Sequence, residues 1–523
     1  MLRRRFLLVT VHLCRLAQRP ICKTRGVVAN LADLVSAAAE SRPRHAAVVT
    51  DQRVVTWSEV DWQVRAVASG LIARGLPAGS RIALMQPNTL EFITTYFGIL
   101  RAGMCAVPLN TGYTAIELDQ MLSDVDASLV VADPRMAPVL DQVPGIDVIH
   151  TGTEDWRRFT VGSSPLPVEP TAPDALAVLL FTSGTSGRPK AAMLTHRALS
   201  ANLDQLSAVQ DPPAMTSDDV VMCVLPLFHI YALNATLGMV ARHGATIVLT
   251  ERFDAAAALA SITRHKVTNV AGAPPMYVAW AGIDGLTEAL QGVRLLISGA
   301  SPLPVSVMEH FQARTGKPIW EGYGMTECSP VITASLVSGR PKPGSVGQPL
   351  PGIEVELRDE DGQVVEDGDP GEIFVRGENV FTGYWPDGSE GPDEQGWFAT
   401  GDVAIEDDEG DLRLVDRRRE LIIVSGFNVY PREVEEVLLS MDGVLEAAVM
   451  GVTDPYTGET VKAFIVAEPG SALTADEVLD FVGTRLARFK CPTVVEIVGD
   501  LPHSVTGKVS KGRLRQSQGV TSL

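Results

Sequence analysis

The sequence contains few cysteines, and none of them belongs to a C-x-x-C pair. The six lie scattered along the chain, at Cys14, Cys22, Cys105, Cys223, Cys328 and Cys491. This spacing argues against a zinc site or a disulfide framework and favours a reducing compartment. The chain also shows no internal repeat and no low-complexity segment. Basic residues are outnumbered by acidic ones, 44 to 63, and the net charge is −19. A surface of that sign repels polyanions, so we expect no nucleic-acid partner.

The first 25 residues depart from this acidic composition. They are basic, and no acidic residue precedes Asp33. Their apolar run, residues 6–16, is interrupted by His12 and Cys14 and is shorter than the roughly 20 residues that a membrane-spanning helix needs. Three interpretations stay open: a basic, poorly ordered extension, a segment that contacts a membrane surface, or a twin-arginine-like export signal. No A-x-A cleavage site follows the run, so export is the least favoured. We expect a cytoplasmic protein, with peripheral membrane contact through residues 1–28 left open.

The next part of the chain alternates helical and strand patterns. With 523 residues, 46% of them hydrophobic and 20% charged, the chain is long enough for more than one globular domain. The periodicity predicts helices over residues 31–39 and 62–74. It predicts strands over residues 46–50, 54–56, 81–85, 175–181, 220–225, 246–249 and 293–298. Apolar strands separated by helices indicate parallel sheets covered on both faces.

The texture changes after residue 344. Turn signals crowd residues 344–414 and predict a small antiparallel unit with strands near 353–357 and 372–375. After a charged stretch, residues 416–420, the pattern indicates a compact α+β unit. We therefore expect an α/β and α+β fold: a large N-terminal domain with two α/β sheet subdomains and a small β subdomain, followed by a small mobile C-terminal domain. The expected divisions are 1–28 (extension), 29–415 (large domain), 416–420 (hinge), 421–515 (small domain) and 516–523 (tail).

A hydroxyl- and glycine-rich run follows the apolar strand that ends near Phe181. It reads Thr182, Ser183, Gly184, Thr185, Ser186, Gly187, Arg188, Pro189, Lys190. Glycines let the backbone approach a phosphate closely, while the hydroxyls and the lysine supply donors. A Walker P-loop places glycine directly before the lysine, whereas Pro189 stands there in this chain. The run predicts a phosphate-binding loop of another kind.

Further motifs follow in a recognisable order. They are Pro226-Leu227-Phe228-His229-Ile230-Tyr231, Ser298-Gly299-Ala300-Ser301, Glu321-Gly322-Tyr323-Gly324-Met325-Thr326-Glu327, Trp397-Phe398-Ala399-Thr400-Gly401-Asp402, Ser425-Gly426-Phe427 and Thr506-Gly507-Lys508. Together with the phosphate run they resemble the adenylate-forming superfamily, which includes acyl-CoA synthetases, 4-coumarate–CoA ligases, luciferases and peptide-synthetase adenylation domains. The resemblance covers residues 29 to 515.

The resemblance implies a role for each motif of the large domain. His229 is an aromatic gate beside the acyl pocket, which Ala300 and Val331 also line. Gly299, Ala300 and Ser301 belong to a segment that flanks adenine and the acyl pocket, and Glu321, Gly322 and Gly324 belong to the ATP/AMP-binding residues. Tyr323 offers a ring that stacks on adenine, and Thr326 hydrogen-bonds phosphate. Glu327 is a hard oxygen ligand suited to Mg²⁺.

The resemblance also assigns residues nearer the C-terminus. Asp402 is the ribose-binding aspartate, and Arg417 supports the ribose and the α-phosphate. Arg419 stands at the hinge. Ser425, Gly426 and Phe427 line the CoA channel, although plant-type relatives carry lysines at the positions of Ile423 and Ser425. Lys508 is the lysine that promotes adenylate formation, and its flanks depart slightly from the family pattern at His503 and Lys511.

These assignments imply an ATP-dependent ligase that forms an acyl-adenylate and passes the acyl group to CoA. The implied substrates and cofactors are a carboxylic acid, ATP, Mg²⁺ and CoA. A medium- or long-chain fatty acid is the first expectation for the acid, and an aryl acid of the 4-coumarate type is the second. A fatty acyl-AMP ligase that loads a carrier protein is a further alternative, disfavoured because the expected insertion is absent. A non-catalytic relative would have lost one of Glu327, Asp402, Arg417 or Lys508. The oligomeric state is left open, with a homodimer as one option.

Overall fold

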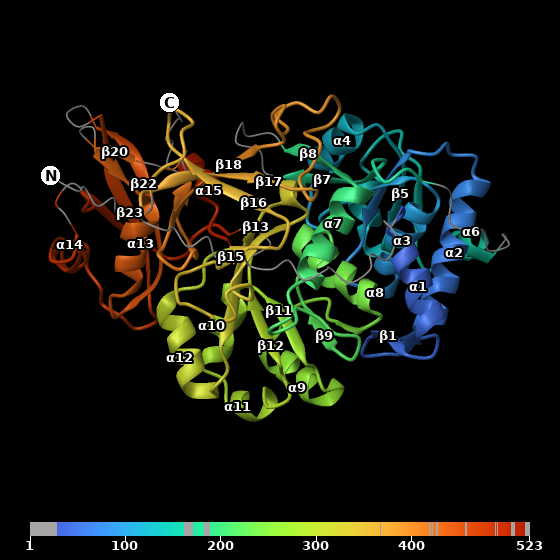
Figure 1. Cartoon of the computed structure of the whole chain (residues 1–523), viewed down its shortest axis with the longest axis horizontal. Helices are drawn as coiled ribbons and strands as arrows, with labels where there is room; N and C mark the ends of the chain where they lie inside the picture. The colour runs from blue at the N-terminus through green and yellow to red at the C-terminus, as the bar shows by residue number, and fades with distance from the viewer. Residues whose placement is uncertain are drawn as a thin grey trace, which may run out of the picture.

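The computed structural model describes most of the chain (Figure 1). The described residues are 29–161, 171–182, 189–366, 368–417, 420, 422–424, 427–454, 458–486, 488, 490–503 and 508–517. Residues 1–28, on which the prediction of membrane contact rests, lie outside this set. None of the described helices is long and apolar enough to cross a membrane.

A nine-stranded sheet forms the centre of the molecule. Its order is β15-β14-β13-β12-β11-β9-β10-β1-β2. Its strands are β1 (Ala46–Val49), β2 (Val54–Thr56), β9 (Val220–Cys223), β10 (Thr246–Leu249), β11 (Asn269–Gly272), β12 (Leu295–Ser298), β13 (Ile319–Gly324), β14 (Val331–Ala334) and β15 (Gln348–Pro349). In the order of the sheet, the strands between β13 and β1 all pair in parallel, as the apolar strand pattern predicts. Antiparallel strands lie at both edges of the sheet.

A six-stranded sheet lies beside it, in the order β6-β5-β3-β4-β7-β8. Its strands are β3 (Arg81–Met85), β4 (Cys105–Pro108), β5 (Ala127–Ala132), β6 (Val148–His150), β7 (Leu176–Thr182) and β8 (Lys190–Thr195). One continuous core joins the two sheets, since Val48 and Ile247 of the first cluster with Ile82 and Val178 of the second. The two predicted α/β subdomains are therefore packed together as one body.

Helices cover these sheets. They are α1 (Asp33–Ser41), α2 (Trp57–Ala73), α3 (Leu90–Arg101), α4 (Ala115–Asp124), α5 (Ala137–Leu140), α6 (Glu154–Val161), α7 (His196–Ser207), α8 (Met239–His243), α9 (Ala255–His265), α10 (Pro274–Ala281), α11 (Leu286–Ala289) and α12 (Val305–Thr315). Helix α2 begins at Trp57, earlier than the predicted residue 62. The cause is a capping box, in which Thr56 Oγ1 accepts from Glu59 N–H and the Glu59 carboxylate accepts from Thr56 N–H at 2.7 Å.

A wide π-helical segment, η2 (Tyr231–Gly238), precedes α8. The sequence pattern does not predict it. Such segments are uncommon and often lie at functional sites. This one begins two residues after His229, and its Tyr231, Ala235 and Thr236 line the same cleft as His229.

The predicted antiparallel unit is a four-stranded sheet, β16 (Glu354–Arg358), β17 (Gly371–Arg376), β18 (Phe398–Glu406) and β19 (Leu412–Arg417). The C-terminal unit has a sheet of its own, with β20 (Ile422–Val424), β21 (Phe427–Val429), β22 (Val444–Asp454), β23 (Gly458–Ala467) and β24 (Val494–Val498). Its helices are α13 (Pro431–Leu439), α14 (Ala475–Gly483) and α15 (Lys511–Ser517). A separate core, which includes Val434, Val449 and Val478, holds the C-terminal unit together. In Figure 1 it lies at the opposite end from the blue N-terminal helices. The expected fold class, a large N-terminal domain and a small C-terminal one, is confirmed.

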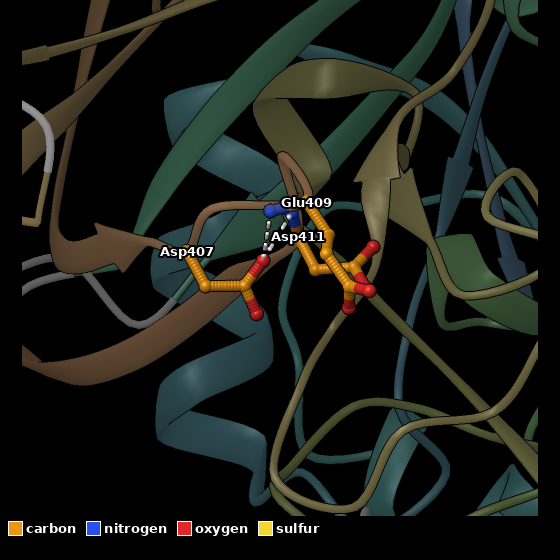
Figure 2. A group of neighbouring side chains, drawn as sticks. All are labelled: Asp407, Glu409 and Asp411. Atoms are coloured by element: carbon orange, nitrogen blue, oxygen red, sulfur yellow. Dashed lines mark hydrogen bonds between the residues drawn. The ribbon is translucent and has the colours of Figure 1, made fainter.

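The turn between β18 and β19 carries a cluster of three carboxylates, Asp407, Glu409 and Asp411 (Figure 2). Their oxygens lie within 4.8 Å of one another, close enough for a cation. The positive charge among these carboxylates comes from Lys342. Its Nζ pairs with Asp407, lies 2.9 Å from the Glu409 carboxylate and lies 3.9 Å from the carboxylate of the fully buried Asp411. Arg340 also pairs with Glu409. This network attaches the β18–β19 turn to the loop before β15.

Candidate active site

A cleft of about 2390 Å³ runs between the two domains. Predicted site residues that line it are Thr182, Lys190, His229, Gly299, Ala300, Ser301, Glu321, Gly322, Tyr323, Gly324, Thr326, Glu327, Val331, Asp402 and Lys508. These residues come from loops and strand ends separated by more than 300 positions in the chain. The fold thus brings the separate motifs to one site.

Other predicted site residues cannot be placed. Ser183, Gly184, Thr185, Ser186, Gly187, Arg419, Ser425 and Gly426 lie outside the described residues. Arg417 and Phe427 are described in their backbone alone. Arg417 pairs across β18–β19 with Asp402, which places its backbone beside the predicted ribose site. The roles of these residues stay predictions.

The phosphate side of the cleft is built on the β7–β8 pair. Thr182 and Lys190 face each other in register at the two ends of the predicted loop, and Thr182 Oγ1 donates to Lys190 O at 3.5 Å. Lys190 forms an ion pair with Glu390 and lies 5.4 Å from the centre of the Tyr384 ring. An ammonium group therefore lies beside Glu390 and Tyr384 on this side of the cleft.

Glu327 lies on a short 3₁₀ turn, Thr326–Cys328, that follows β13. It is only 5% exposed, and Tyr384 OH donates to its Oε1 at 2.6 Å. Phe381 N–H also donates to Glu327 O at 2.8 Å. Burial and the neighbouring Glu327 charge raise the pKa of Tyr384, so that this tyrosine stays protonated and donates. The site thus holds a carboxylate in a fixed orientation.

The nucleoside side contains a second tyrosine–carboxylate pair. Tyr323, at the end of β13, donates its hydroxyl to Asp402 Oδ2 at 2.6 Å. Tyr323 is 8% exposed, and burial raises its pKa well above the ordinary value. Asp402 on β18 is half-buried and lines the cleft. This places a carboxylate acceptor next to an aromatic ring, as a ribose and a base require.

Small residues give the cleft its flat wall. Gly324 packs on the segment that leads into β14, where an added Cβ would lie 2.1 Å from Pro330 O. A Cβ on Gly299 would lie 3.0 Å from the Tyr231 ring. Ala300 has φ +70°, a left-handed conformation that is uncommon for alanine. At Gly324 and Gly299 the missing side chain lets Pro330 and the Tyr231 ring pack directly against the backbone of the cleft wall.

Glu321 forms a buried corner of the cleft. Its Oε1 accepts from Leu303 N–H at 3.1 Å, while Oε2 has no hydrogen-bond partner among the described residues. Burial raises the pKa of Glu321 to about 7, although the Leu303 N–H and the charge of Arg432 oppose this shift. Arg432 belongs to α13 of the small domain, so Glu321 lies at the seam between the domains.

Lys508 reaches the cleft from the small domain. It is exposed and lines the cleft. Its charge acts on His229: burial, together with this positive charge, lowers the pKa of His229 to about 4. His229 is therefore neutral near pH 7. The domain arrangement described here brings the lysine of the small domain to the predicted acyl gate.

On the phosphate side of the cleft, Tyr384 and Glu390 were not predicted from the sequence. Both belong to a turn-rich segment between β17 and β18. The signal that was available was an aromatic pair, Tyr384-Trp385, after Gly383. Nothing in that pattern indicated that Tyr384 contacts Glu327, because the two are 57 residues apart.

Comparisons with known proteins agree with this geometry. The family model "AMP-binding enzyme" matches residues 35–385, and "AMP-binding enzyme C-terminal domain" matches residues 433–508. A long-chain-fatty-acid–CoA ligase of Yersinia pestis is 36% identical over 89% of this chain and 90% of its own length. A feruloyl-CoA synthase of Amycolatopsis is also 36% identical, over 92% of this chain and 97% of its own.

A solved relative gives information on the domain arrangement. ATP-bound MatB from Rhodopseudomonas palustris is 32% identical and superposes with a TM-score of 0.88, over 93% of this chain and 99% of its own. The apo crystal structure of MatB, covering 94% and 98% at 33% identity, gives 0.77. The chain thus resembles the ATP-bound form more closely. The chain belongs to the AMP-binding enzyme family, within which it is an AMP-forming acid–CoA ligase that uses ATP and CoA.

Proposed function

We propose that the acid activated by this enzyme is a medium- or long-chain fatty acid. The observation that carries the proposal is the apolar part of the cleft lining. Besides His229, the cleft is lined by apolar side chains such as Leu206, Met215, Val221 and Met239. A chamber of this composition favours an alkyl chain, since burying apolar surface contributes about 25 cal/mol per Å². The Yersinia pestis relative is named for long-chain fatty acids.

In the first half-reaction, a carboxylate oxygen of the acid attacks the α-phosphorus of ATP. The bond to the β-phosphate oxygen breaks, and pyrophosphate leaves. Negative charge gathers around the α-phosphorus, so donors already in place lower the barrier. We assign this role to Lys508, Lys190 and the run from Thr182 to Gly187, with Asp402 and Arg417 holding the ribose. Tyr323 lies against adenine, beside Gly299, Ala300, Ser301, Glu321, Gly322 and Gly324.

The donor set fits Mg²⁺ at Glu327. Its carboxylate is a hard oxygen ligand, buried and oriented by Tyr384, and Thr326 lines the same part of the cleft. When bound, the ion neutralises phosphate charge.

In the second half-reaction, the thiol of CoA attacks the carbonyl carbon of the adenylate. A carbon–sulfur bond forms, AMP leaves, and the thiol proton is released. We propose that the small domain rotates about Arg419 between the two steps, withdrawing Lys508 and presenting Ser425, Gly426 and Phe427 to the thiol. His229 and Ala300, with Val331, border the acyl group throughout.

Pyrophosphate release from a panel of acids tests the substrate. Hexadecanoate and octanoate should give higher kcat/KM values than malonate or benzoate, because the shorter acids leave the apolar chamber empty. A ranking in which malonate exceeds both fatty acids would refute the proposal. Supplying CoA or a holo-carrier protein to the same reaction separates the ligase from a carrier-loading enzyme, for which the carrier would be preferred.

An aryl acid is the second candidate, on a specific observation. Tyr231 and Ser298 line the cleft, and their hydroxyls are buried without a hydrogen-bond partner among the described residues. Unpaired buried hydroxyls favour a substrate that carries a polar group. The Amycolatopsis relative is named for feruloyl-CoA. Ferulate in the panel, assayed with Tyr231→Phe, discriminates: the substitution should lower kcat/KM for ferulate and leave hexadecanoate unchanged.

A further inference from the structure

The turn formed by residues 383–391 is held tightly by its own backbone. Tyr384 N–H donates to Ser389 O at 3.0 Å, and Gly388 N–H donates to Tyr384 O at 2.8 Å. A Cβ on Gly391 would lie 3.0 Å from Gly383 Cα, so the two ends of the turn are in contact. Glu390 has φ +54°, a left-handed conformation that non-glycine residues keep only where the surroundings impose it.

The 383–391 turn is attached to the phosphate side of the cleft. Met193 N–H donates to Gly383 O at 3.0 Å, and Trp385 N–H donates to Ala191 O at 2.8 Å. The two residues on the sheet side of these bonds, Met193 and Ala191, belong to β8, the strand that begins with Lys190. The turn is thus an extension of the sheet edge from which Lys190 projects.

Tyr384 connects the turn to Glu327. Its hydroxyl donates to Glu327 Oε1 at 2.6 Å, and its ring stacks edge-on against Phe381 at 5.1 Å. The ring also lies under Lys190 Nζ at 5.4 Å. One side chain therefore contacts both the carboxylate and the ammonium group of the phosphate side.

Glu390 contacts the same lysine with the opposite charge. Its carboxylate pairs with Lys190 Nζ, and both residues line the cleft. Its side chain is 58% exposed and that of Lys190 is 29% exposed, so solutes in the cleft can reach the pair. A polyphosphate that binds Lys190 must therefore compete with the Glu390 carboxylate for the ammonium group.

We propose that the 383–391 turn is a further element of the ATP site, with two opposed effects. Tyr384 is a positioning residue that orients Glu327 toward the metal of metal–ATP. Glu390 is a counterion that holds Lys190 while ATP is absent and competes with the triphosphate for it. This inference rests on the proposed roles of Glu327 and Lys190 in the adenylating reaction.

Calorimetric binding of ATP by the full-length protein, without any acid and at a series of Mg²⁺ concentrations, tests Tyr384. Mg²⁺ should raise the affinity of the protein for ATP, and the measured quantity is the Mg²⁺ concentration at which half of this increase is reached. In Tyr384→Phe this concentration should rise about tenfold, the scale for losing a group that orients a metal ligand. The matched control is Tyr323→Phe, which removes the equivalent hydroxyl from Asp402. It should weaken ATP binding equally at all Mg²⁺ concentrations.

The same titration tests Glu390. In Glu390→Gln the dissociation constant of ATP should fall roughly threefold at low salt, the scale of an exposed ion pair, and the gain should shrink as salt screens the charges. Glu394→Gln, at an exposed position of the same segment, is the control and should leave the constant unchanged.

The outcomes separate this inference from the proposed function. If the wild-type protein binds ATP with no dependence on Mg²⁺, the proposed role of Glu327 fails. If the wild type shows that dependence and Tyr384→Phe retains it unchanged, the positioning role of Tyr384 is refuted. If both variants weaken ATP binding alike, the turn has a purely structural role and Glu390 is no competitor.

Discussion

The two walls of the cleft are built in different ways. On the large-domain wall, Glu327 and Asp402 each accept a tyrosine hydroxyl at 2.6 Å, and Glu327 is nearly inaccessible to solvent. On the small-domain wall, Lys508 is exposed. A group that is fixed by burial is ready before substrate arrives, whereas an exposed one acts through the position of its whole domain. This contrast fits the proposal that the large domain organises ATP while the small domain selects the half-reaction.

The largest effect is expected from the small-domain wall. Lys508→Ala should slow adenylate formation, measured by pyrophosphate exchange, by roughly 10² or more, the scale for losing one preorganised electrostatic donor. Thioester formation from supplied acyl-AMP should be largely spared. Lys462→Ala removes a small-domain lysine that pairs with Glu496 instead, and should change neither rate. Equal losses of rate in both half-reactions for Lys508→Ala would contradict the proposal that Lys508 acts in adenylate formation alone.

On the fixed wall, Asp402→Asn keeps the size of the side chain and removes its charge. We expect the KM for ATP to rise about tenfold or more, because hydrogen bonds to a charged group contribute about 1.5–3 kcal/mol. Steady-state kinetics at saturating acid measure it. The control is Asp408→Asn, an exposed neighbour of the same hairpin. An unchanged KM would remove Asp402 from the ribose site.

Packing behind the fixed wall offers a test through stability. In Gly324→Ala the new methyl group would meet Pro330 O, so β13 and the Thr326–Cys328 turn must shift. Overpacking of this kind costs about 1–3 kcal/mol. We expect a lower Tm in thermal unfolding, and adenylation to be lost before thioester formation. Gly292→Ala, where a Cβ meets nothing within 4 Å, should behave as the wild type. A normal Tm for Gly324→Ala would show that the wall is less rigid than its contacts indicate.

The smallest effect is expected at the seam. Burial raises the pKa of Glu321 from 4.5 to about 7. As the pH rises from about 4.5 to 7, Glu321 loses its proton in the unfolded state but keeps it in the folded state. The free energy of unfolding should therefore fall as the pH rises through this range. Glu321→Gln should flatten that part of the Tm-against-pH curve. A curve of the same slope as the wild type would show that another group is responsible.

The sequence predicted which motifs line one cleft better than it predicted the contacts between them. Strand ends, glycines and the residues Glu327, Asp402 and Lys508 follow from local motifs, and the parallel sheets follow from apolar strand runs. Strand β3 was predicted at its observed bounds. The pairing of Tyr384 with Glu327 could not be predicted, because it depends on how a turn folds back across the β7–β8 edge. The π-helical segment η2 also escaped prediction, since its residues have the apolar pattern of an ordinary helix.

The network at Lys342 has a consequence for the reaction cycle. It ties the turn of the β18–β19 hairpin to the large domain, and Val346 N–H donates to Leu412 O at 2.9 Å beside it. Asp402 belongs to that hairpin. If the small domain rotates about residues 416–420, the hairpin stays attached to the large domain and does not move with the small domain. The nucleotide half of the adenylate then stays docked while the lysine departs and the thiol enters, and the reactive intermediate never has to be released between the two steps.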